Sequence, residues 1–142
     1  MKTSKEILSS IAKTTQMGQV GIRSVMNYTE SKGLQQALHS QLKEYDMIEE
    51  EAFRIAEQRG WEIQQLDPGL KLMSQAYAKA NLMMGNRDSR IAAMMINGNT
   101  KGVVKGIKNQ HHGNRNDMQV NKLAEKLLSF ENANIRQMQE YL

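Results

Sequence analysis

The stretch "GWEIQQLDPGLKLMSQAYAKANLMMGNRD" (residues 60–88) decides how the helices of this chain connect. It lies between two pairs of long amphipathic segments and is long enough to run the length of a helix pair. Gly60 suits the end of the preceding helix, while Asp67 and Pro68 suit the start of a short helix over about 68–84. The stretch therefore predicts a long crossover connection that contains a short extra helix.

Four longer helices are predicted on either side of this connection. Thr3 and Glu6 form a capping box at the start of the first helix, and the second helix covers about residues 34–59. The third begins at the N-cap candidate Asp88 and stops at "HHGN", and the fourth covers about residues 117–142. The predicted inward stripes are, in chain order, Ile7, Ile11, Thr14, Gly18, Ile22 and Val25; Leu34, Leu38, Gln41, Tyr45, Ile48, Ala52 and Ile55; Ile91, Ala92, Met95, Asn99, Gly102, Val103 and Gly106; and Val120, Ala124, Leu127, Glu131, Asn134, Met138 and Tyr141.

The lengths of the connections predict the topology. Tight turns make the first two helices, and the last two, antiparallel neighbours, and the long connection between the pairs then gives a ferritin-like four-helix bundle. A plain up-down-up-down bundle is the alternative, if "GNRD" only kinks one continuous helix. The stretches "TTQMGQV" (14–20) and "GNTKGVV" (98–104) resemble each other and are followed at similar distances by Tyr45 and Glu131, which favours the ferritin-like arrangement. We expect an all-α chain with a single domain over residues 1–142.

Composition excludes several classes of protein. A chain of 142 residues can bury a core without disulfides or structural metal. The absence of cysteine excludes thiolate chemistry and zinc or iron–sulfur sites built on sulfur. No signal peptide and no apolar run of about 20 residues is visible. We therefore expect a cytoplasmic protein without a membrane span.

Glycines recur at four-residue steps inside the third helix. Each interior glycine costs about 1 kcal/mol relative to alanine, so their presence needs a reason. We expect Gly98, Gly102 and Gly106 to face Gly18 and Gly21 of the first helix, so that the two backbones approach closely. A phosphate cradle is the competing interpretation, but "GNTKG" matches neither the P-loop nor the dinucleotide-binding pattern.

Four segments together resemble a known family. They are "KTTQMG" (13–18), "LKEYDMIEEEA" (42–52), "IAAMMINGNTKGV" (91–103) and "LAEKLLSFENANI" (123–135). They resemble small uncharacterised bacterial proteins with ferritin-like four-helix bundles, which form a domain of unknown function. The resemblance covers most of the chain and implies this fold. It implies no reaction and no functional residues, because the family has no established activity.

The wider ferritin-like group suggests a di-iron site, which needs Glu on two helices and Glu-x-x-His on the other two. This sequence departs from that pattern. Its corresponding inward positions offer one certain carboxylate, Glu131, and none of His39, His111 and His112 has the spacing of a ligand pair. We therefore expect no cofactor, with iron or another metal at an altered site as the alternative.

Polar residues nevertheless occur at similar heights on the inward stripes. One interpretation is a hydrogen-bonded network that fixes helix register, because buried polar groups tend to satisfy one another. The other is an altered metal or small-ligand pocket centred on Glu131, whose burial would raise its pKa. The candidate residues are Thr15, Gln41, Tyr45, Asn99, Glu131 and Asn134.

Charge is distributed unevenly, since residues 33–67 carry a net charge of −5 and residues 71–115 carry +7. On the third helix a basic stripe follows helical spacing and consists of Lys101, Lys105, Lys108, His112 and Arg115. Pairing with the acidic second helix, within the fold or across a dimer, would explain it. We do not expect nucleic acid as a partner, because no aromatic residues are interleaved with the basic residues of the stripe and no nucleic-acid recognition motif is present. Binding of an anionic polymer through this stripe stays an alternative function.

Eleven methionines, including the pairs Met83-Met84 and Met94-Met95, are expected to fill an irregular core. An adaptable groove for a partner helix, or soft copper ligands, are the alternatives. No nucleophile stands beside a base, and no pair of carboxylates has a defined acid–base spacing. We therefore expect a non-enzymatic structural or protein-interaction role, as a homodimer or higher oligomer with an unidentified protein partner. A metal-binding or redox relative of ferritin is the second interpretation.

Overall fold

The computed structural model describes residues 1–67 and 69–142, and every regular element in these residues is a helix. The elements are α1 (Ser4–Val25), the short 3-10 helix η1 (Met26–Tyr28), α2 (Lys32–Gln58), α3 (Gly69–Leu82), α4 (Arg87–His112) and α5 (Met118–Gln139). The all-α prediction is confirmed. Pro68, expected in the first turn of the short helix, lies outside the described residues. No helix in the described ranges combines the length and apolar character needed to span a bilayer.

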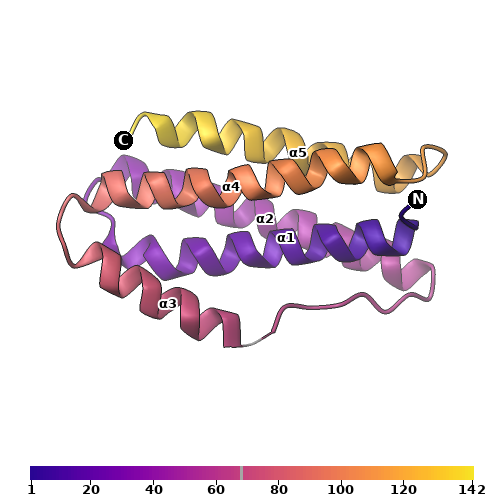
Figure 1. The fold of residues 1–142 in the computed structure, drawn as a ribbon, viewed down its shortest axis with the longest axis horizontal. Coiled ribbons are helices and arrows are strands. Elements are labelled where there is room, and N and C mark those ends of the chain that lie inside the picture. Colours follow the sequence, from indigo (N-terminus) through magenta and orange to yellow (C-terminus); the bar gives the residue numbers. More distant parts are fainter. Residues whose placement is uncertain (68) are drawn as a thin grey trace.

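The direction of the helices confirms the ferritin-like arrangement. In Figure 1, α1 and α2 run antiparallel, as do α4 and α5. An extended segment leads from the end of α2 back along the bundle to α3, which packs beside α1. Because the chain has returned to its earlier end, α4 runs parallel to α2, which is the crossover of a ferritin-like bundle.

The break at "GNRD" is a true helix end. Gly85 and Asn86 both have a positive φ, of 88° and 49°, and two consecutive left-handed residues cannot continue a helix. The up-down-up-down alternative, which needs a continuous helix here, is therefore wrong. Asn86 is also the N-cap of α4, in place of the expected Asp88. The Asp88 carboxylate instead accepts hydrogen bonds from the amides of Glu30 and Ser31 at 2.7 and 3.0 Å, which ties the start of α4 to the turn between α1 and α2.

The other helix boundaries follow the local signals. The reciprocal capping box of Thr3 and Glu6 is present, with both hydrogen bonds at 3.1 Å. Ser31 caps α2, which begins two residues earlier than expected, and Asp117 caps α5. Arg59 closes α2, and Gly60 follows it with a φ of 70°. The caps at Thr3 and Asp117 are those predicted from the sequence, whereas the Ser31 cap was not predicted and Arg59 is the C-cap in place of Gly60.

The predicted apolar stripes form a single core. Every position of the α2 stripe is buried, and the buried residues of the other helices join the same cluster. Helix α1 packs on α2 and α4, and α5 packs on the same two helices, so α2 and α4 occupy opposite corners of the bundle. The basic stripe of α4 therefore cannot pair with acidic α2 within one molecule, and this intramolecular explanation is wrong.

Polar contacts close the ends of the bundle. At one end the Arg59 guanidinium holds the Asp117 carboxylate at 2.6 and 3.1 Å, and the Ser4 hydroxyl donates to the same carboxylate.

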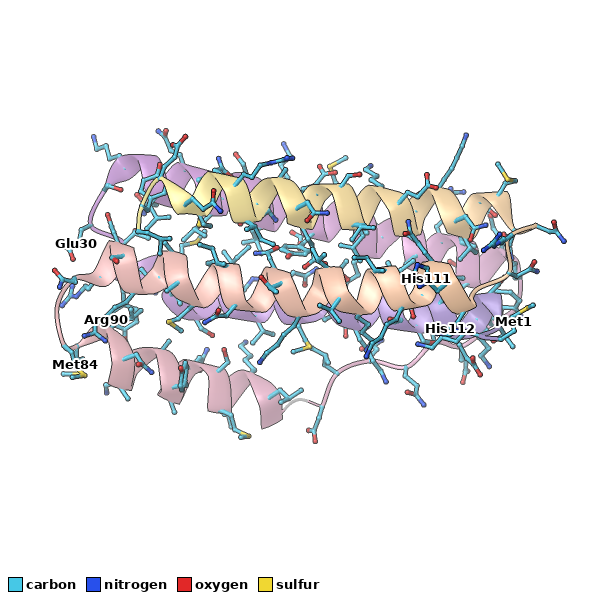
Figure 2. All side chains as sticks on the ribbon, turned by 45° about the horizontal axis from the view of Figure 1, so that its top comes forward. Met1, Glu30, Met84, Arg90, His111 and His112 are labelled. Carbon is cyan, nitrogen blue, oxygen red and sulfur yellow. The ribbon has the colours of Figure 1, made fainter. Side chains whose placement is uncertain are left out.

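Figure 2 shows His111 and His112 near Met1 at one end of the bundle and Met84 near Arg90 at the other. The paired histidines therefore lie far from the middle of the bundle.

Helix α3 covers only part of the bundle. Ala78 and Leu82 are its buried residues, whereas Leu72, Met73 and Tyr77 are exposed. The expectation that methionines fill the core holds for Met95 and Met138, which are buried, and is wrong for the seven exposed methionines, which include the pair Met83 and Met84. The latter pair lies at the turn before α4, where no second helix covers it.

Candidate functional site

A buried polar cluster lies in the middle of the bundle. The Tyr45 hydroxyl lies 2.9 Å from Glu131 Oε2 and 3.0 Å from Asn99 Oδ1. Asn134 Nδ2 donates to the same Asn99 oxygen at 3.3 Å, and Asn99 Nδ2 donates to the Met95 carbonyl at 2.8 Å. Three helices, α2, α4 and α5, therefore contribute one connected network, and four of the six predicted polar residues belong to it.

The other two predicted residues do not join this network. Thr15 donates its hydroxyl to the Ala12 carbonyl at 2.7 Å, a bond within its own helix. Gln41 donates its amide to Gln137 Oε1 at 2.9 Å, so its partner is a residue that the sequence reasoning missed. Helical spacing alone could not show which neighbours these two side chains meet.

Proton counting leaves two charge states for Glu131. The Tyr45 hydroxyl carries one proton and faces two acceptor atoms, Glu131 Oε2 and Asn99 Oδ1. The Asn99 oxygen already accepts from Asn134 Nδ2, so Tyr45 can donate its proton to an ionised Glu131. When Glu131 is protonated, it can donate to the Tyr45 oxygen, and Tyr45 then donates to Asn99. The network fits both states, and burial favours the protonated one.

The electrostatic environment agrees with this assignment. Burial raises the pKa of Glu131 to about 7, against a smaller lowering by its bond to Tyr45. Burial, followed by the adjacent Glu131, raises the pKa of the Tyr45 hydroxyl well above its usual range. The tyrosine ring is held by an edge contact with Phe130, at 4.7 Å between ring centroids. Glu131 is therefore mostly protonated below pH 7 and mostly ionised above it, whereas Tyr45 stays neutral over this range.

The predicted packing of glycine against glycine is wrong. A Cβ built on Gly18 would lie 2.4 Å from Cζ of Tyr45, and a Cβ on Gly102 would lie 2.3 Å from a Glu131 oxygen. These two glycines make room for the two central residues of the polar cluster. Gly106 meets Leu128, Gly21 meets only the Met95 methyl group, and Gly98 is exposed with open space around it.

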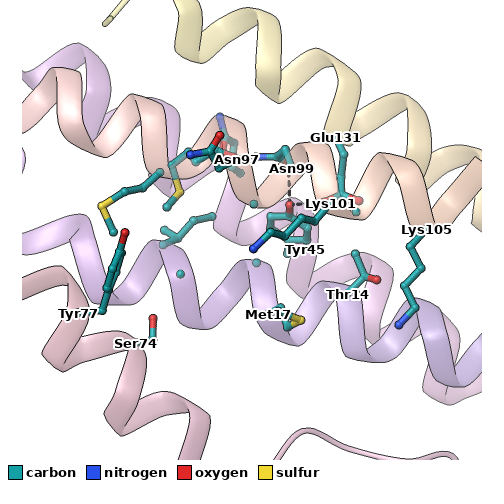
Figure 3. A pocket seen from close by; sticks show the side chains of 18 residues that line it. Thr14, Met17, Tyr45, Ser74, Tyr77, Asn97, Asn99, Lys101, Lys105 and Glu131 are labelled. Atoms are coloured by element: carbon teal, nitrogen blue, oxygen red, sulfur yellow. Dashed lines mark hydrogen bonds between the residues drawn. The ribbon is translucent and has the colours of Figure 1, made fainter. Parts of the chain in front are cut away.

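A cavity of about 410 Å³ leads from the surface to this cluster. Its buried floor is formed by Gln41, Tyr45 and Glu131, and its exposed mouth includes Met17, Tyr77, Lys101 and Lys105, as Figure 3 shows for the labelled side chains. The volume falls within the range of small-molecule sites. Four of the predicted packing glycines, Gly18, Gly21, Gly98 and Gly102, line this cavity, so the two glycine-bearing helices enclose a space between them.

Two atoms on the cavity floor have no partner in the described structure. Gln41 Oε1 and Glu131 Oε1 are buried and accept no hydrogen bond there. A buried polar atom without a partner costs about 1–3 kcal/mol, so such atoms are uncommon in a layer that serves packing alone.

The basic stripe is shorter than predicted. Lys101, Lys105, Lys108 and His112 are exposed along α4, but the helix ends at His112 and Arg115 lies in the turn that follows. Lys101 and Lys105 also line the cavity. In the part of the chain that the structure describes, no residue of the stripe forms an ion pair.

The donors present do not fit a di-iron centre. Such a centre needs several carboxylates and two histidines, whereas the middle of this bundle offers Glu131, a tyrosine hydroxyl and amide groups. Across the described residues, no group of three or more His, Cys, Asp or Glu side chains is placed to hold a metal ion. The chemistry of the site is therefore that of hydrogen bonding.

Comparison with solved structures identifies the same fold in another protein. The chain is similar to the E. coli stress protein YciF, with a TM-score of 0.76 over 99% of this chain and 94% of that chain, at 16% sequence identity. No protein-family model matches the sequence, and no curated protein sequence matches it. The chain therefore shares the ferritin-like helical fold of YciF, and a likeness at this identity shows the fold alone.

Proposed function

We propose that this chain is a non-enzymatic binding protein whose bundle holds a small organic molecule in the cavity above the Tyr45 cluster. The observation that carries the proposal is a cavity of about 410 Å³ that is lined by glycines from two helices and ends on a buried polar floor. Each interior glycine costs about 1 kcal/mol of helix stability. A bundle selected only for stability would fill this space with side chains.

A register-fixing network is the competing interpretation, and it predicts different behaviour. Such a network needs buried partners and gains nothing from an opening to solvent. Two features of the floor favour a ligand, namely the unpartnered oxygens of Gln41 and Glu131. A ligand that donates hydrogen bonds to them would recover the energy they lack.

The test is a nuclear magnetic resonance screen of the labelled protein with a library of small organic molecules. Binding molecules are expected to shift the backbone amides of cavity residues such as Gly98 and Lys101. Gly98→Leu should weaken their binding, because it adds a side chain where open space borders the cavity. Gly98→Ala is the matched control, since it gives the same gain in helix propensity with one methyl group.

A second variant that blocks the cavity is needed, because a leucine at the exposed Gly98 could turn toward solvent and leave the cavity open. Gly21→Leu adds bulk from the opposite helix, where a Cβ would make an ordinary contact of 3.7 Å with the Met95 methyl group. A library with no binder at these amides, or binding that survives both leucine variants, would overturn the proposal.

Oligomer formation is also part of the proposal. Helix α3 exposes Leu70 and Met73, which are 40% and 70% accessible and lie three residues apart on one helix face. Exposed apolar side chains on one helix face favour association. Sedimentation analysis should detect a dimer or larger species, and replacing these two residues with polar ones should shift it to a monomer.

A further inference from the structure

Lysines gather at one side of the cavity mouth. Lys101 and Lys105 of α4 line the cavity. Burial lowers the pKa of Lys105, and the charges of nearby Lys13 and Lys2 lower it further. Lys13 donates to Gln64 Oε1 at 2.7 Å and Lys2 donates to Asn109 Oδ1 at 2.8 Å. Both acceptors are neutral, so they orient the ammonium groups without neutralising their charge.

No acidic side chain balances this cluster. In the described ranges the ion pairs are Arg54 with Glu51, Arg59 with Asp117 and Lys126 with Glu44, and all three lie elsewhere. Ammonium groups that repel one another are stabilised by a bound anion. Two members of the cluster, Lys101 and Lys105, line the mouth of a cavity, which favours a small anion that enters the cavity over a polymer.

The cavity below the lysines is mainly apolar. Ile22 and Met95 are buried in its wall, and Met17, Met94 and Tyr77 lie nearer to solvent. Methionine side chains adapt to ligands of different shape because they are flexible and polarizable. The cavity therefore suits a molecule with an apolar body.

The floor is compatible with an anion when Glu131 is protonated, which its burial favours below pH 7. An ionised carboxylate there would repel a negatively charged ligand, whereas the protonated acid does not. Tyr45, the other titratable group on the floor, is also neutral, so positive charge at the mouth dominates the cavity.

Resting on the proposed function above, we propose that the ligand is a small amphipathic organic anion. Its acidic group lies beside Lys101 and Lys105, and its apolar body lies between Met17, Met94 and Tyr77. A hydrogen-bond donor at its inner end faces the unpartnered oxygens of Gln41 and Glu131 on the floor.

The test compares three probes with the same eight-carbon chain and different head groups, namely octanoate, 1-octanol and octylammonium. Titrations followed by backbone amide shifts locate each probe and give its dissociation constant. Octanoate should bind roughly tenfold more tightly than 1-octanol, because its carboxylate can accept a charge-assisted hydrogen bond from a lysine at the cavity mouth. Octylammonium should bind more weakly than either probe, because the lysines repel its positive charge. All three should shift amides of the cavity, such as those of Gly98 and Gly102.

Charge-reversal variants distinguish the effect of the lysines at the cavity mouth on octanoate binding from the effect of the protein's net charge. The double variant Lys101→Glu and Lys105→Glu should weaken octanoate by roughly tenfold or more and leave 1-octanol unchanged. The matched control, Lys108→Glu with Lys122→Glu, gives the same net charge at exposed positions that do not line the cavity. It should change octanoate binding by no more than about twofold, because exposed charges at a distance are screened.

The outcomes distinguish the two proposals. Equal binding of octanoate and 1-octanol, or octanoate binding that survives reversal of Lys101 and Lys105, overturns the anionic ligand and leaves the cavity as a ligand site. Failure of all three probes to shift the cavity amides counts against both proposals.

Discussion

Glu131→Gln tests the proton that burial favours on Glu131. Glutamine has nearly the shape of a protonated glutamate, and its amide can donate to the Tyr45 oxygen as the neutral acid does. It cannot ionise. The variant therefore keeps the geometry of the cluster and removes its dependence on pH.

The magnitude follows from the pKa of Glu131, which burial raises from an ordinary 4.5 to about 7. Below pH 4.5 the acid is protonated in both the folded and the unfolded chain, so its stabilising contribution is complete. Between pH 4.5 and 7 only the unfolded chain releases the proton, and wild-type stability falls by about 3 kcal/mol. Above pH 7 the loss levels off, because both states are ionised.

The free energy of unfolding of the variant should lack this pH-dependent loss of stability. The second N–H of the glutamine amide replaces an oxygen and has no partner, which costs about 1 kcal/mol at every pH. The variant should therefore be about 1 kcal/mol less stable than wild type near pH 4.5 and about 2 kcal/mol more stable at pH 8. A change of sign between these values is the diagnostic result.

Urea unfolding followed by circular dichroism, at half-unit steps from pH 4.5 to 8.5, measures the difference between the two proteins. Groups that titrate in both proteins cancel in this difference. Glu50→Gln on the exposed surface of α2 is the control, and its difference from wild type should stay constant with pH. If Glu131→Gln is less stable than wild type by the same amount at every pH, then burial does not raise the pKa of Glu131 and the reasoning is wrong.

Three further substitutions test the packing and the end of the bundle. Gly18→Ala should destabilise the fold by about 1–3 kcal/mol, because the added methyl group collides with the buried Tyr45 ring. Gly98→Ala should instead stabilise it by about 0.5–1 kcal/mol, since nothing lies near the new methyl group and alanine favours the helix. Thermal and urea unfolding measure both, and equal effects of the two substitutions would contradict the assigned roles. Asp117→Asn should cost about 1–2 kcal/mol at pH 7, because the bidentate bond from Arg59 is lost. That bond lowers the pKa of Asp117, so its contribution is complete above the ordinary value of 3.8 and is lost as the pH falls below it. Acid titration of unfolding should show wild type and Asp117→Asn converging at low pH.

The polar cluster illustrates how far sequence reasoning reaches. Periodicity placed Tyr45, Asn99 and Glu131 on inward stripes, and all three are buried in one network. The same periodicity placed Gln41 inward, and Thr15 was a further candidate for the polar layer, yet both bond elsewhere. A helical stripe fixes which side of a helix faces the core, but a hydrogen bond depends on atoms placed within a few tenths of an ångström by several helices at once.

The glycines show a second limit. The prediction that a neighbour lies close to these glycines is confirmed for Gly18 and Gly102 and is wrong for Gly98, and the neighbours are not the glycines expected. Gly18 and Gly102 accommodate Tyr45 and Glu131, whereas Gly98 borders an open cavity. The spacing of the glycines shows that one helix face lacks side chains. It does not show which neighbouring group, if any, occupies the space beside that face.

Local signals in the sequence predict the helices, the caps at Thr3 and Asp117, and the crossover, because capping side chains, glycine breaks and apolar periodicity act within a few residues of one another. The tertiary structure is needed to show that Tyr45, Asn99 and Glu131 meet in one buried network. It is also needed to show that lysines of α4 lie at the mouth of a cavity and away from the acidic helix. These properties arise from the distances between separate helices, which depend on how all the side chains of the bundle pack together.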